Sequence, residues 1–164
     1  MMQVINKEII WGYLNEVPDP EIPVINIVEL GIARDVEIQN NKVVISITPT
    51  YSGCPAIKAI EQDIVSVLKD KGISEVEIKT VYSPAWTTDW LTDIAKEKLR
   101  VYGIAPPEKA TSDKSSLTLN PKRVPCPLCG SSNTSLISQF SSTACKALYR
   151  CNDCKEPFDY FKCH

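Results

Sequence analysis

The chain has 164 residues, enough for one ordinary domain and a small second one but too few for two full hydrophobic cores. Its 18 basic and 20 acidic residues nearly cancel, so total charge gives no support to a protein that binds a polyanion through a strongly basic surface. No apolar run approaches the ~20 residues that a membrane-spanning helix needs, which argues against a membrane protein.

Residues 1–103 carry the pattern of a small α+β sandwich, in which helices pack on a three-stranded sheet. Apolar residues at helical spacing predict helices, and Asn-rich turn chemistry at 39–42 predicts a hairpin. Pro55 is expected to open one helix and Gly72 to stop it. The expected order is a helix at 6–15, strands at 32–38 and 43–48, a helix at 55–70, a strand at 75–81, and a helix from Thr87 or Thr88 to about Tyr102.

A polar stretch rich in proline follows, and it predicts a linker at 104–123 between the body at 1–103 and a small metal-binding ribbon domain at 124–164. The charge differs between the two parts. Residues 1–103 have 10 basic and 15 acidic residues, whereas residues 121–164 have 6 and 3. A basic tail can dock a protein or bind nucleic acid weakly, although two small surfaces can also differ by chance.

Four cysteines in the tail form two short pairs with 21 residues between them, Cys126 with Cys129 and Cys151 with Cys154. Two residues between paired cysteines let both thiolates face one ion, and two such turns supply a tetrahedral set. Zinc is the expected metal, and iron is an alternative because it also binds to four thiolates in a tetrahedral arrangement. Two disulfides are the alternative, but they need an oxidising compartment, and the chain does not open on a secretory pattern. A cytoplasmic protein is therefore expected.

Two loops of the body use residues that a core does not need. Asp19 and Glu21 lie in a turn held by three prolines. Cys54 lies in or just before the first turn of the helix expected at 55–70, where unpaired backbone N–H groups and the helix dipole favour a thiolate. A thiolate there can bind a soft metal or act as a nucleophile; the alternative is a small buried hydrophobe.

The only histidine is the last residue, His164. A catalytic set of serine or cysteine with a histidine base is therefore not expected, and the chain is predicted not to be an enzyme.

The motifs resemble known families. Residues 19–24 (DPEIPV), 48–55 (TPTYSGCP) and 84–90 (PAWTTDW) are similar to the iron-sulfur assembly domain family. The tail at 126–130 (CPLCG), 140–151 (FSSTACKALYRC) and 156–164 (EPFDYFKCH) resembles the PaaD family, also called PaaJ, small subunits encoded with phenylacetyl-CoA epoxidase.

The resemblance implies an accessory protein that builds or delivers iron-sulfur clusters, with the reductase that feeds the epoxidase of phenylacetate breakdown as its client. The oxygenase of the same system is the other client that the resemblance allows. The resemblance makes Cys54 a transient ligand of iron or a cluster. Asp19 and Glu21 would be further ligands, a proton acceptor, or only loop geometry. The supporting loop residues would be Thr48, Gly53 and Trp86. Since ordinary clusters need four ligands, a homodimer or the client would supply the rest.

Three further residues of the tail, Cys145, Cys163 and His164, are possible extra metal ligands that a four-cysteine site does not use. Two other functions remain open. One is an integral, non-catalytic subunit of the epoxidase complex. The other is a ribbon-based adaptor for nucleic acid or protein, although the near-neutral charge makes nucleic acid an unfavoured partner.

Overall fold

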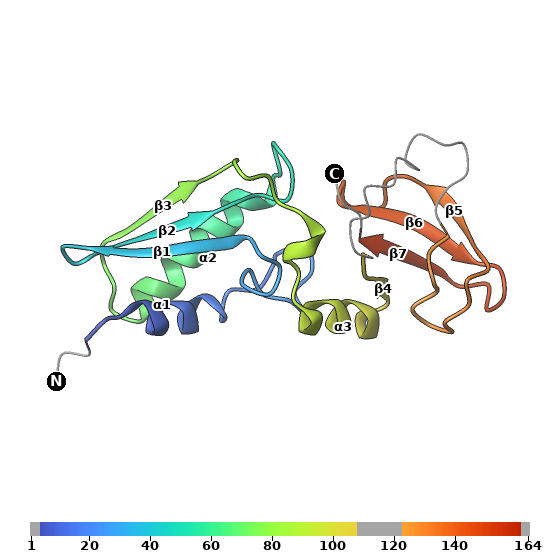
Figure 1. Cartoon of the computed structure of the whole chain (residues 1–164), viewed down its shortest axis with the longest axis horizontal. Coiled ribbons are helices and arrows are strands. Elements are labelled where there is room, and N and C mark those ends of the chain that lie inside the picture. The colour runs from blue at the N-terminus through green and yellow to red at the C-terminus, as the bar shows by residue number, and fades with distance from the viewer. Residues whose placement is uncertain (1–3, 108–122, 162–164) are drawn as a thin grey trace. The chain divides into compact units, whose positions relative to one another are not determined.

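The computed structural model describes residues 4–107 and 123–161, and the chain separates into two compact units, Met1–Trp86 and Thr87–His164. Figure 1 shows the elements of each unit. Within the described residues no helix has both the length and the apolar character required to cross a bilayer. The mixed α and β content agrees with the predicted fold class.

The first unit is built on a three-stranded sheet in the order β1-β2-β3. β1 and β2 are antiparallel, while β2 and β3 are parallel and joined through α2. α1 contacts β1 and α2, and α2 contacts β3. The elements are α1 (Lys7–Leu14), β1 (Ala33–Gln39), β2 (Lys42–Ile47), α2 (Ala56–Asp70) and β3 (Val76–Thr80).

The local signals act as expected in this unit. Asn40 and Asn41 both have positive φ, 47° and 71°, as a two-residue hairpin between twisted strands requires. Pro55 is the N-cap of α2, and Gly72, with φ 86°, follows the helix end. The buried positions Ile60, Ile64 and Leu68 recur every four residues and give α2 its core-facing side.

The second unit contains a four-stranded sheet in the order β4-β7-β6-β5. Its elements are the 3₁₀ turn η1 (Thr88–Trp90), α3 (Asp93–Tyr102), β4 (Ile104–Ala105), β5 (Thr134–Ser138), β6 (Lys146–Cys151) and β7 (Pro157–Phe161). β4 pairs in parallel with β7, so the first residues of the predicted linker at 104–123 form a strand. Residues 108–122 of that linker lie outside the described residues.

The start of the last helix differs from the expectation. Thr87 does accept a hydrogen bond from the backbone of Asp89, but it caps only the short η1 turn. Thr92 is the N-cap of α3, and its hydroxyl accepts from the backbone N–H of Ala95 at 3.1 Å. Thr87 and Thr92 are both suitable N-cap residues. The spacing of apolar residues does not show which of them begins the longer helix.

Candidate metal centre and the loops of the first unit

Four thiols converge at one end of the second unit's sheet. The sulfurs of Cys126, Cys129, Cys151 and Cys154 all lie within 4.8 Å of one another. Sγ of Cys126 is 3.8 Å from Sγ of Cys154, and Sγ of Cys129 is 3.5 Å from Sγ of Cys151. A tetrahedron with metal–sulfur bonds of about 2.3 Å has sulfur–sulfur edges of about 3.8 Å. The donor set therefore fits one tetrahedral metal ion.

The two cysteine pairs sit in equivalent turns. In each, the residue after the second cysteine has positive φ: Gly130 at 77° and Lys155 at 69°. In each, the first cysteine donates its backbone N–H to a carbonyl beyond the turn, Cys126 to Ser131 at 2.9 Å and Cys151 to Glu156 at 3.0 Å. The repeated geometry explains why two residues between cysteines suffice to aim both sulfurs at one point.

A polar network ties one turn to the other. The side chain of Asp153, which lies between Cys151 and Cys154, accepts hydrogen bonds from the hydroxyl of Ser131 and the amide of Asn133, the latter at 3.1 Å. Asn152 donates its backbone N–H to the Asn133 carbonyl at 2.8 Å. Outer contacts of this kind orient metal ligands. These residues were not among the predicted site residues, although the polar pair Asn152 and Asp153 between the two cysteines was a usable signal.

The thiols cannot all ionise together without a cation. The backbone N–H of Cys154 favours the thiolate of Cys151 and, against desolvation, lowers the pKa of Cys151 to about 7. For Cys154, the backbone N–H of Glu156 also favours the thiolate. Burial and the neighbouring thiols outweigh it and raise the pKa of Cys154 to about 12. A lowered pKa at one cysteine and a raised pKa at its neighbour are expected where several thiols share a small space, and a bound divalent metal would stabilise their thiolates.

The centre rests on a small core. Cys126 and Cys151 are buried together with Tyr149 and Phe158, and the rings of Tyr149 and Phe158 stack at 5.8 Å between centroids. Tyr160 meets the ring of Tyr149 edge-on. Few apolar side chains fill this core, so the ribbon depends on a bound metal more than a domain with a full core would.

Of the three possible extra ligands, only Cys145 lies within the described residues, and it does not join the four converging thiols. Cys145 is buried, and its sulfur lies 3.0 Å from the hydroxyl of Thr143, but it is not one of the four converging thiols. Cys163 and His164 lie outside the described residues, so their role as ligands stays a prediction. Next to Cys145 is a buried lysine, Lys146, whose ammonium is 3.9 Å from the Asp159 carboxylate.

In the first unit, Asp19 holds its own loop. Its carboxylate accepts the backbone N–H groups of Glu21 at 2.9 Å and Ile22 at 2.8 Å, and the residue is buried. This pattern is an Asx turn, which stiffens the backbone. Of the three expected roles for the acidic loop, loop geometry is the one that these two hydrogen bonds support. Glu21 is half-buried.

Cys54 comes directly before Pro55, the N-cap of α2, as expected from the sequence. The residue is 8% exposed, and its carbonyl accepts from the backbone of Ile57, so the backbone around it is held by the start of the helix. Gly53 before it has φ 80°, a left-handed conformation that favours glycine. The supporting residue Thr48 is buried at the end of β2.

Trp86, the third supporting residue, is buried, and its indole Nε1 donates to the carbonyl of Leu30 at 2.9 Å. This contact anchors the loop after β3 to the segment before β1. Throughout residues 4–107 and 123–161, the ribbon cysteines are the one set of three or more Cys, His, Asp or Glu ligand atoms that converge. Cys54, Asp19 and Glu21 therefore do not form a preformed metal site.

Comparison with known families finds one family for the first part of the chain and another for the tail. Residues 7–80 match the profile of the family described as iron-sulfur cluster assembly protein, and residues 110–162 match the PaaD zinc beta ribbon domain.

Among characterised proteins, the chain is 50% identical over 154 residues to a protein of Escherichia coli (strain K12) that is provisionally named as one of the subunits of 1,2-phenylacetyl-CoA epoxidase. The match covers 94% of this chain and 91% of the relative. It is also 35% identical to the Fe-S protein maturation auxiliary factor YitW of Bacillus subtilis (strain 168), over 58% of this chain and 94% of that protein.

Solved structures resemble the first part of the chain. A domain of unknown function from Bacillus anthracis superimposes with a TM-score of 0.53 at 33% identity, covering 57% of this chain and 90% of that one. A conserved hypothetical protein of Thermotoga maritima gives 0.52 at 28% identity, covering 60% and 98%. The predicted resemblance and the α+β fold class are thus confirmed.

Proposed function

Because the chain belongs to the PaaD family, which joins an iron-sulfur cluster assembly domain to a zinc β ribbon, we propose that it is an accessory protein of iron-sulfur cluster assembly or delivery. The observation that carries this is the 50% identity with the epoxidase-associated relative, together with an assembly domain shared with a named maturation factor. The client we propose is the iron-sulfur reductase of the phenylacetyl-CoA epoxidase system. The protein itself turns over no substrate.

Cys54 is the residue proposed to hold iron or a cluster during delivery. Its backbone is held at the start of α2, and it offers one soft ligand. No second ligand set converges on it within the described residues. Ordinary clusters take four protein ligands, so the client supplies the remaining ligands of the iron or cluster bound at Cys54. A single ligand from this chain also makes release to the client easier.

The loop of Asp19 and Glu21 contributes to the proposed Cys54 site through its fixed backbone conformation. Asp19 uses one carboxylate oxygen to accept two backbone N–H groups, and this fixes the turn that presents Glu21. Glu21 is then the member of the pair proposed to assist as a ligand or proton acceptor while the cargo is bound.

The ribbon is proposed to hold zinc as a structural ion. A closed set of four thiolates leaves no open position for a substrate, and the sulfur spacing fits that geometry. The ribbon then retains its zinc while Cys54 releases its iron or cluster to the client.

The test separates the two metals. The full chain would be purified without oxygen as wild type, as Cys54→Ala and as Ser52→Ala, a control at an exposed position of the same loop. About one zinc per chain is expected in all three, with iron and acid-labile sulfide in the wild type and in Ser52→Ala only. Equal iron and sulfide in Cys54→Ala would contradict the assignment of Cys54.

The delivery role is tested on the client. The reductase would be produced together with each of the three forms, and its iron and sulfide content measured after separation. We expect a loss of client cluster with Cys54→Ala and none with Ser52→Ala. A reductase loaded equally well without this chain would contradict the proposed function.

A second candidate is an integral component of the epoxidase, which the provisional name of the Escherichia coli relative favours. It predicts a fixed stoichiometry of this chain in the purified complex. It also predicts that epoxidation falls when the chain is removed from a complex whose reductase already holds its cluster. Under the delivery proposal, activity survives that removal.

A further inference from the structure

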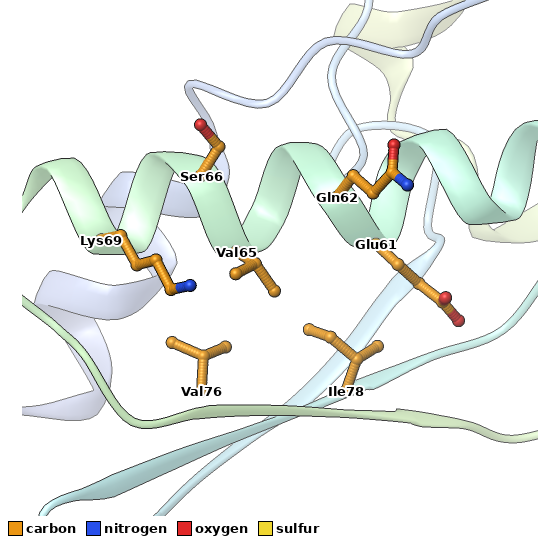
Figure 2. Close-up of a pocket in the computed structure, with 7 residues that line it drawn as sticks. All are labelled: Glu61, Gln62, Val65, Ser66, Lys69, Val76 and Ile78. Atoms are coloured by element: carbon orange, nitrogen blue, oxygen red, sulfur yellow. The ribbon is translucent and has the colours of Figure 1, made fainter.

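β3 is an edge strand with an apolar groove beside it. It pairs with β2 on one side, and no described strand pairs with the other. A groove of about 570 Å³ lies between α2 and β3 (Figure 2). Its apolar side chains are Val65 from the helix and Val76 and Ile78 from the strand, all half-buried. An unpaired edge next to half-exposed apolar side chains is a surface suited to a further strand.

Charges are ordered along this groove. Glu61, Val65 and Lys69 follow one another at intervals of four residues, and Figure 2 shows them along the side of α2 that faces β3. Glu61 lies at the Thr80 end, where it accepts a hydrogen bond from the Thr80 hydroxyl at 3.1 Å. Lys69 lies at the Val76 end. The helix thus presents an acid at one end of the groove and a base at the other.

The strand carries an acid and a base on its opposite face, in the reverse order along the groove. Successive strand residues point to alternate faces, so Glu77 and Lys79 flank Ile78 on the face away from the groove. Glu77 also forms an ion pair with Lys42 of β2. Each face of the edge therefore has one acid and one base, on opposite sides of Ile78.

We propose that the occupant of this edge is a second copy of the chain, whose β3 pairs antiparallel with the first about a two-fold axis at Ile78. In that register, Glu77 lies opposite Lys79 of the second copy, and Lys79 lies opposite its Glu77. Opposite charges directly across an antiparallel pair are favourable. The same axis turns the acidic end of one helix toward the basic end of the other, so Glu61 faces Lys69 of the second copy.

Among axes at Glu77, Ile78 and Lys79, only the axis at Ile78 pairs Glu77 with Lys79 and places no like charges opposite each other. An axis at Glu77 places two carboxylates opposite each other, and an axis at Lys79 places two ammonium groups opposite each other, which is destabilising in both cases. A two-fold interface needs a surface that complements itself, and the edge has this property about Ile78. The product is a continuous six-stranded sheet with both α2 helices on one side.

The proposed dimer does not bring the two copies of Cys54 together. Val65 lies near the axis, and Cys54 is about 16 Å from it along α2 at 1.5 Å per residue. The two thiols therefore lie at opposite ends of the dimer, and each stays available to its own client. The inference goes beyond the proposed function and does not depend on Cys54.

Sedimentation of the full chain tests the interface through exchanged charges. The wild type is expected to shift from monomer to dimer mass between about 1 and about 100 µM. Glu77→Lys alone faces like charges across the axis, and so does Lys79→Glu, so each is expected to weaken self-association at least about tenfold. An equimolar mixture of these two variants restores the opposite charges, and we expect it to form a heterodimer.

Glu37→Lys on β1, the other edge of the sheet, is the matched control and should associate like the wild type. The heterodimer guards against misfolding, because two misfolded variants would not recover each other's dimer. Three results would each overturn the proposal: a monomeric wild type at about 100 µM, single variants that dimerise like wild type, or a mixture that stays monomeric. Iron retention at Cys54 is measured separately, so either proposal can fail without the other.

Discussion

Asp153 shows how much a single polar residue contributes to the metal centre. It lies between two cysteine ligands, and its carboxylate reaches across to Ser131 and Asn133 next to the other pair. These contacts also lower the pKa of Asp153 below its ordinary value, with the Ser131 hydroxyl as the main cause. The residue is not one of the four converging thiols, yet its hydrogen bonds join the turn of one cysteine pair to that of the other.

Replacing Asp153 with alanine should therefore weaken zinc binding by about 10-fold to 100-fold, the usual cost of losing an outer contact of a metal ligand. Competition with a chromophoric chelator measures the affinity. The matched control is Glu156→Ala, because the Glu156 side chain is exposed nearby and only its backbone takes part in the turn. Equal affinities for the two variants would show that the network does not orient the ligands.

Among individual residues, sequence identified the four ligand cysteines but not their support. Ligand spacing follows from the geometry of a short turn and is visible in the chain. The partners of Asp153 lie about 20 positions away, and nothing local indicates which polar residues of the first turn face the second. For Asp19, the local pattern named the residue, and its hydrogen bonds to the backbone of its own loop support one of its three expected roles, that of loop geometry.

Among the elements, the helices and strands of the first unit agree with the expected ranges to within one or two residues, because each has a clear start and stop signal. In the second unit, α3 differs from the expectation, because Thr92 rather than Thr87 or Thr88 is its N-cap. The second difference is β4, two residues long, which pairs with β7 more than 50 positions later. A two-residue strand carries no periodicity, so sequence could not reveal it.

The cap assignment predicts unequal effects of two similar substitutions. Thr92→Ala should lower the free energy of unfolding by about 1 kcal/mol, since it removes the cap of a ten-residue helix. Thr87→Ala, the control, removes only the cap of the η1 turn and should cost less. Urea unfolding of both variants measures the difference, and a larger loss with Thr87→Ala would favour the sequence-based start of the helix.

In the molecule as a whole, the two units are stabilised differently. The first buries a broad apolar core that includes Ile10, Ile45 and Ile64, whereas the core of the ribbon is small and partly made of metal ligands. Removal of zinc should therefore unfold the ribbon and leave the first unit folded. Amide NMR spectra before and after chelation test this, and loss of signals from α2 together with those from β6 would contradict it.

Zinc retention should also depend on pH, with a definite sign. An ordinary thiol has a pKa near 9.0, and the pKa of Cys151 is lowered to about 7. The stabilisation of its thiolate is therefore complete above the ordinary pKa and lost as pH falls through about 7. Cys154, with a pKa of about 12, must release a proton to the solvent before it binds. Both effects weaken zinc binding on acidification.

The expected result is a zinc affinity that falls steadily from about pH 8 to about pH 5, measured by chelator competition at each pH. The proposed self-association through β3 gives a control within the same chain, because the ion pair with Lys42 holds the pKa of Glu77 below its ordinary value and keeps that carboxylate charged over the range. An affinity that did not change with pH would contradict a thiolate site.

The α+β body, the cysteine pairs, the position of Cys54 before α2 and the resemblance to the PaaD family could all be predicted from the chain alone. The resemblance rests on the likeness of short motifs to those of known proteins, and the other three depend on periodicity, turn chemistry and short spacings, which act between residues close together in the chain. The folded structure was needed for whatever depends on distant segments: the convergence of the four sulfurs, the contacts of Asp153 and Trp86, the strand at Ile104–Ala105, and the open edge of β3. Such contacts are set by packing and register, and a linear sequence does not show which of its parts will meet.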